Sequence, residues 1–181
     1  KGMANFMELA PRAQRQIIRR MEPLEPPALH QAQAAYGWLE LGNVEEAFAE
    51  LQRLPEELQS LPAVQAVRLD CLMAAKDWNE AVKLAQVLCG QWTEEPGLWL
   101  HHAYAARRCA GGSIEAAYEL LAPCVERFPE EWLIPYNVAC YLCQMERLDE
   151  ARAMLEMARS KGGERVDTMA KDDEDLAPLN L

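Results

Sequence analysis

The stretch GNVEEA at residues 42–47 decides the fold, because a matching stretch recurs three more times along the chain. It returns as KDWNEA at 76–81, GSIEAA at 112–117 and ERLDEA at 146–151. In each stretch a bulky apolar residue follows a break in the pattern, and an alanine comes three places later. These alanines lie 34, 36 and 34 residues apart: Ala47, Ala81, Ala117 and Ala151. The sequence therefore predicts an internal repeat of about 34 residues.

Each repeat has the pattern of two paired helices. Its apolar residues are spaced by three and four, which is the period of a helix and not of a strand. Asn43, Asp77 and Ser113 are residue types that cap helix N-termini, and glutamate follows the first two at the spacing of a capping box. A small alanine lets the two helices approach closely. We therefore expect an all-α protein in which each helix pair covers an apolar face of its neighbour.

These features resemble the tetratricopeptide repeat (TPR) family, whose units carry W-x2-L-G-x2-Y, then A-x3-F, then proline. The third unit keeps Trp99 and Pro129 at the matching positions, and two residues are inserted in its hairpin at 110–113. The resemblance implies a right-handed α-α superhelix whose first helices line a concave groove. The short length and the tail also resemble small bacterial TPR proteins. Four units match the family: 28–61, 62–95, 96–131 and 132–163.

Two segments flank the repeats. Residues 1–27 form a basic arm, expected to be helical, followed by a proline-rich linker, and residues 164–181 form an acidic cap or tail. The arm either caps the first repeat or reaches a groove, as a built-in competitor or as the contact of a homodimer. The acidic run Asp172-Asp173-Glu174-Asp175 is expected to be a solvated tail or helix end.

Composition narrows the classes of function. The formal net charge is −11, with +4 on residues 1–21 and −15 on the rest. An acidic chain is repelled by phosphate backbones, so we expect no nucleic-acid partner. No apolar run reaches the length of a membrane span. Six cysteines without a secretory leader favour a reducing, cytoplasmic location over a disulfide framework.

The TPR resemblance also implies which side chains face a partner. Arg107 and Arg108, with His101 and Tyr104 one and two turns away, are one candidate anion site. The alternative is that the two arginines pair with neighbouring acids such as Glu115 or Glu119. The groove positions of the first helices also include Gln33, Val67 and Cys140. The residues predicted to contact a partner are Tyr36, Glu40, Asp70, Met73, His101, Tyr104, Arg107, Arg108, Tyr136, Asn137 and Gln144.

The sequence predicts no catalytic, metal or cofactor site. Cys140 and Cys143 lie on one helix face, but a second cysteine pair and a matching pair of histidines are missing. We therefore expect both cysteines to be buried and to act as small apolar residues; a redox role is the alternative.

The resulting functional hypothesis is a non-catalytic TPR scaffold or adaptor that binds a peptide or helical segment of a protein partner in its groove. One alternative is a small TPR chaperone of the secretion type. Another is an assembly component that binds through its convex face, which a large exposed apolar patch on that face would favour.

Overall fold

The prediction of an all-α chain is confirmed. A computed structural model describes residues 24–180, and within that range there are eleven α-helices, one 3₁₀-helix and no strand. The basic arm lies almost entirely outside the described residues. The helices are α2 (Ala28–Glu40), α3 (Val44–Gln52), α4 (Glu56–Gln59), α5 (Pro62–Ala75), α6 (Trp78–Gln91), α7 (Pro96–Ala106), α8 (Ile114–Leu121), α9 (Cys124–Arg127), α10 (Leu133–Gln144), α11 (Leu148–Gly162) and α12 (Glu164–Lys171), followed by the 3₁₀-helix η1 (Glu174–Leu179).

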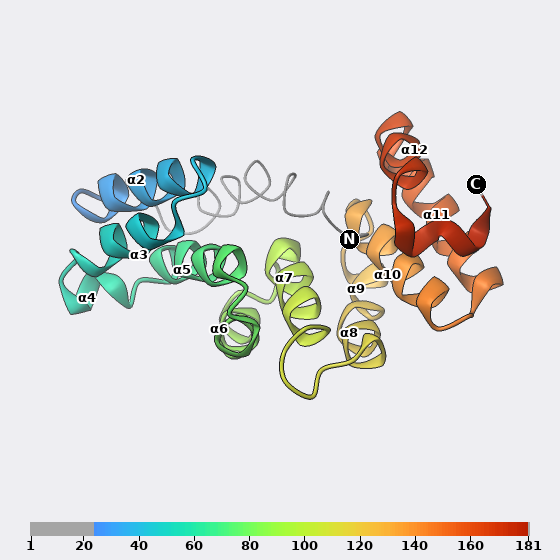
Figure 1. Cartoon of the computed structure of the whole chain (residues 1–181), viewed down its shortest axis with the longest axis horizontal. Coiled ribbons are helices and arrows are strands. Elements are labelled where there is room, and N and C mark those ends of the chain that lie inside the picture. The colour runs from blue at the N-terminus through green and yellow to red at the C-terminus, as the bar shows by residue number, and fades with distance from the viewer. Residues whose placement is uncertain (1–23, 181) are drawn as a thin grey trace.

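Helices that follow one another in sequence pack together in pairs. The pairs are α2 with α3, α5 with α6, α7 with α8, and α10 with α11. Figure 1 shows them in sequence order along an arc, with α5, α7 and α10 on the inner side and α6 and α8 on the outer side. Each pair also packs against the next, through α3 and α5, α6 and α7, and α8 and α10.

The second helix of each of the first three pairs begins at a side-chain cap, as the sequence predicts. Asn43 accepts a hydrogen bond from the backbone N–H of Glu46 at 3.2 Å, and Asp77 accepts one from Glu80 at 3.3 Å. The Ser113 hydroxyl accepts from Ala116 at 3.1 Å. Each cap satisfies a donor that the first turn of a helix leaves unpaired.

The turns between paired helices share one backbone conformation. Gly42, Lys76 and Glu146 have φ values of 75°, 59° and 62°, and each lies five residues before the repeated alanine. In the third pair the positive φ falls on Gly111, at 76°, because the turn is longer and spans 107–113. The predicted insertion is therefore a longer turn, and the repeat resumes after it.

The repeated alanines lie in the interior of the array. All four have no exposed surface, and the residues four places later are also buried. The corresponding position of the first helices is fully buried as well, even where leucine replaces alanine. Those first-helix residues are Ala35, Leu69, Ala103 and Ala139.

Prolines shorten two of the second helices. Pro55 follows α3 and precedes the single turn of α4, while Pro123 separates α8 from α9. Proline has no backbone N–H and clashes with the carbonyl four residues earlier, so a helix cannot run through it unbroken. α6 and α11 contain no proline and run for 14 and 15 residues.

The C-terminal segment folds back onto the array. α12 packs against α11, and η1 packs mainly against α10. The expectation of a solvated acidic run is wrong for half of it: Asp173 and Asp175 are buried, whereas Asp172 and Glu174 are exposed. Among the described helices none has the length and apolar character needed to cross a membrane.

Replacing glycine by alanine should change the stability in opposite directions at Gly112, in the third turn, and at Gly90, on α6. A Cβ atom at Gly112 would lie 2.0 Å from the backbone oxygen of Ala106, whereas one at Gly90 on α6 would meet nothing within 4 Å. Gly112→Ala should lower the unfolding free energy by about 1–3 kcal/mol, the usual cost of overpacking. Gly90→Ala should raise it by about 0.5–1 kcal/mol, because alanine favours the helix. Urea titration measures both, and equal effects would contradict the described turn.

Candidate partner-binding groove

The predicted groove residues come from α2, α5, α7, α10 and the ends of these helices. Glu40 and Gln144 are exposed, and Arg107 and Arg108 are partly exposed. Met73 is only 1% exposed and belongs to the core, so in this conformation it presents no surface to a partner. The remaining members are buried: Tyr36, Asp70, His101, Tyr104, Tyr136 and Asn137.

Three of these residues form one buried polar network that joins three first helices. The Tyr36 hydroxyl on α2 donates to Asp70 Oδ2 on α5 at 2.7 Å. The other carboxylate oxygen, Asp70 Oδ1, lies 3.4 Å from His101 Nε2 on α7. His101 Nδ1 lies 2.6 Å from the Gly97 carbonyl oxygen. Because that oxygen can only accept, Nδ1 carries a hydrogen and Nε2 is the nitrogen that faces Asp70.

Burial sets the protonation of this network. It raises the pKa of Asp70 to about 8, although the Tyr36 hydrogen bond opposes the shift. It lowers the pKa of His101 to about 4, against the effect of the Gly97 carbonyl. Both shifts favour neutral forms, since charge is costly to bury. Near pH 7 these pKa values favour the neutral form of both groups, with the carboxyl of Asp70 facing the unprotonated Nε2 of His101.

The two adjacent arginines at the end of α7 take separate roles. Arg107 Nη1 lies 2.8 Å from Asp175 Oδ2, and its Nη2 lies 3.4 Å from Asp175 Oδ1. The guanidinium of Arg108 stacks over the ring of Tyr104 at 3.6 Å, with Trp78 further out. Arg107 thus holds a carboxylate of the chain's own tail and not an acid of α8, while Arg108 forms a cation–π contact.

Asp173 and Asp175 are the residues of this site that sequence analysis missed. The Tyr136 hydroxyl donates to Asp173 Oδ2 at 2.8 Å. Gln144 Nε2 donates to the backbone oxygen of Asp175 at 3.1 Å. The sequence feature that could have revealed them is the pattern Asp-x-Asp-Leu-x-x-Leu at residues 173–179. In this pattern the two acids lie next to leucines, which are residues that tend to be buried. We call the side chains that hold these residues the tail site: Arg107, Tyr136, Cys140 and Gln144.

Asn137 makes a different contact from the one expected of a groove amide. Its Nδ2 donates to the Leu133 carbonyl one turn earlier at 2.8 Å, within α10. The side chain therefore supports its own helix, and it is 3% exposed.

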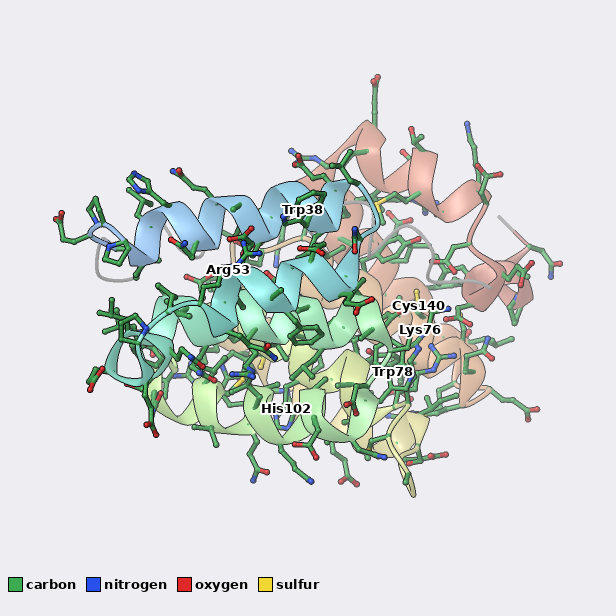
Figure 2. The ribbon with its side chains drawn as sticks, turned by 60° about the vertical axis from the view of Figure 1, so that its left-hand side comes forward. Trp38, Arg53, Lys76, Trp78, His102 and Cys140 are labelled. Atoms are coloured by element: carbon green, nitrogen blue, oxygen red, sulfur yellow. The ribbon has the colours of Figure 1, made fainter. Side chains whose placement is uncertain are left out.

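The cysteine pair of α10 is buried. Cys140, labelled in Figure 2, places its Sγ 3.7 Å from Asp173 Oδ2. Burial raises the pKa of Cys140 well above its ordinary value and that of Cys143 to about 11. Thiolate, the reactive and metal-binding form, is thus disfavoured at both positions. Within residues 24–180 no group of three or more His, Cys, Asp or Glu side chains is placed to hold a metal ion.

The polar network predicts a pH dependence of stability. The folded-state pKa of Asp70 is raised from 3.8 to about 8, so its stabilising effect is lost as pH rises through that range. The folded-state pKa of His101 is lowered from 6.5 to about 4, so its effect is lost as pH falls below 6.5. Below pH 6.5 the two trends oppose each other, and above it only the Asp70 trend remains.

The wild-type unfolding free energy should therefore fall by about 1–2 kcal/mol between pH 6.5 and 8. Asp70→Asn keeps an acceptor for Tyr36 and a donor for His101, so it should remove most of this slope and be more stable than wild type at pH 8. The exposed Asp172→Asn is the matched control and should keep the slope. Urea titrations at the two pH values measure this, and an unchanged slope in Asp70→Asn would refute the assignment.

The chain matches no known family of proteins and no curated protein. Its function must therefore be inferred from the arrangement of the residues described above.

Proposed function

We propose that the protein is a non-catalytic interaction module of the TPR type, a scaffold or adaptor that binds a peptide or helical segment of a protein partner in its groove. The observation that carries this proposal is the tail site. Side chains of α7 and α10 hold a short segment that is not part of an α-helix, through hydrogen bonds to its carboxylates and to its backbone.

The recurring turn and the buried alanines support the repeat assignment. Positive φ at Gly42 and again at Lys76, 34 residues later, is what a repeated helix-turn-helix unit produces. Consecutive pairs that pack mainly against their neighbours are typical of repeat arrays. A TPR assignment accounts for both features with one unit.

The polar chemistry of the inner helices also suits binding better than catalysis. Asp70 and His101 both have strongly shifted pKa values, and their polar atoms face each other, the Tyr36 hydroxyl and the Gly97 carbonyl. A general acid or base needs a polar atom within reach of a substrate. In this arrangement their polar atoms are used to join α2, α5 and α7.

A second candidate is binding through the outer face. A surface hollow of about 460 Å³ lies among α3, α5 and α6, lined by Phe48, Leu72, Leu84 and Val87 together with Arg68 and Lys83. Val87 is 54% exposed. Partly apolar hollows of this kind are common at sites where proteins meet.

Photo-crosslinking distinguishes the two faces. A benzoylphenylalanine is placed either at Gln33, which is exposed on α2 one turn before Tyr36, or at Val87 on the outer face. Irradiation of producing cells, followed by mass spectrometry of the adducts, should yield a defined partner from Gln33 and little from Val87. Adducts from Val87 alone would reject groove binding and favour the outer face. The Arg107→Ala/Arg108→Ala variant carrying the Gln33 probe then tests whether the α7 end contributes.

A further inference from the structure

We propose that the tail site is a binding site for acidic–leucine segments of other proteins, of the form Asp-x-Asp-Leu-x-x-Leu, and that the chain's own tail is its resident competitor. This inference rests on the proposed groove-binding function and names the chemistry of the ligand. The tail provides the template because its contacts show which features of a segment the site recognises.

The first recognised feature is the spacing of two carboxylates. Asp173 accepts hydrogen bonds from Tyr136 and from the Cys140 thiol, and Asp175 accepts two from Arg107. Asp172 precedes Asp173, and Glu174 lies between Asp173 and Asp175. Both of these acids are exposed and take no part in the contacts just described. The site therefore selects acids two residues apart and does not simply attract negative charge.

The second feature is a backbone contact next to the second acid. Gln144 donates to the carbonyl oxygen of Asp175, a contact that any residue at that position of a bound segment offers. Arg107 also lies 5.9 Å from the ring of Tyr141, so its guanidinium is held between an aromatic face and the tail. Charge-assisted and two-pronged contacts of this kind fix a ligand's register as well as adding affinity.

The third feature is a pair of leucines. Leu176 is 1% exposed and Leu179 is 5% exposed, and both join the apolar core of the protein. Ala177 and Pro178, between them, are exposed. Residues at positions 1, 3, 4 and 7 of the segment are thus buried, and the others face outward.

The tail has the properties of a segment that another chain could replace. It is a six-residue 3₁₀-helix containing Pro178, and an isolated helix of that length has little stability of its own. Burial raises the pKa of Asp173, which means that placing its charged carboxylate in the site costs free energy. What favours the tail is its attachment, since a tethered segment has an effective concentration of about millimolar. A partner segment with the same pattern must overcome that advantage, so the tail lowers its apparent affinity.

Fluorescence polarisation with a labelled peptide tests the proposal. The probe is the tail sequence Asp172–Asn180, and the protein is the full chain in three forms. Asp175→Arg places a second guanidinium against Arg107 and should release the tail. Glu174→Arg makes the same charge change at the exposed neighbour and is the matched control. Wild type and Glu174→Arg should bind at least about tenfold more weakly than Asp175→Arg.

A second substitution locates the site. Arg107→Ala, added to Asp175→Arg, removes the guanidinium that would hold the peptide's second acid, so affinity should fall by at least about tenfold. Equal affinity of wild type and both single variants, or no binding to a folded Asp175→Arg chain, would overturn the proposal.

If circular dichroism shows that Asp175→Arg is unfolded, wild type itself provides the test. Excess peptide should then speed hydrogen exchange of the amides in residues 174–179 while other helices stay protected, and unchanged exchange would overturn the proposal. These outcomes are independent of the Gln33 crosslink: a groove that captures a partner but not this peptide retains the proposed function and loses the ligand class.

Discussion

The structure depends on how closely the helices of each pair can approach. Where α2 meets α3, and at each later pair, an alanine without exposed surface marks the contact, and a larger side chain there would overpack it. The buried apolar residues of the described pairs belong to one cluster, so each pair is stabilised by the next. The turns that set the pair geometry also recur, with positive φ even at Lys76 and Glu146, where a left-handed backbone is unfavourable for residues other than glycine.

Once the pairs are stacked, polar groups of the first helices must be buried together. Asp70, His101 and Tyr36 lie on three successive first helices, and their polar atoms contact one another and the nearby backbone. Neutral forms of the acid and the imidazole solve this problem without a buried charge. At the C-terminal end of α7 and on α10, Arg107 and Tyr136 contact the carboxylates of the tail. The same inner surface thus contains a fixed polar network and a site held by an exchangeable segment.

Local signals in the sequence predicted the helices well and the site only in part. The caps at Asn43, Asp77 and Ser113 and the longer third turn follow from residue type and spacing, which act within a few residues. The partners of Arg107 and Tyr136 could not be predicted in this way, because they lie 68 and 37 residues away. Charge patterning alone suggested a solvated acidic run, and tertiary contacts with the inner helices overrode it at Asp173 and Asp175. At Met73 the error has the opposite direction. The resemblance to the TPR family suggested that this residue faces a groove, but the structure buries it in the core.

The central claim is that the tail is seated on the inner helices through Arg107 and Asp175, whose side chains are 18% and 12% exposed. A double-mutant cycle of Arg107→Ala and Asp175→Ala, measured by urea unfolding, tests it most directly. The predicted result is a coupling energy of about 1 kcal/mol, because each single substitution removes the same interaction. Additive effects, within about 0.3–0.5 kcal/mol, would mean that the two residues do not interact in solution and would contradict the account.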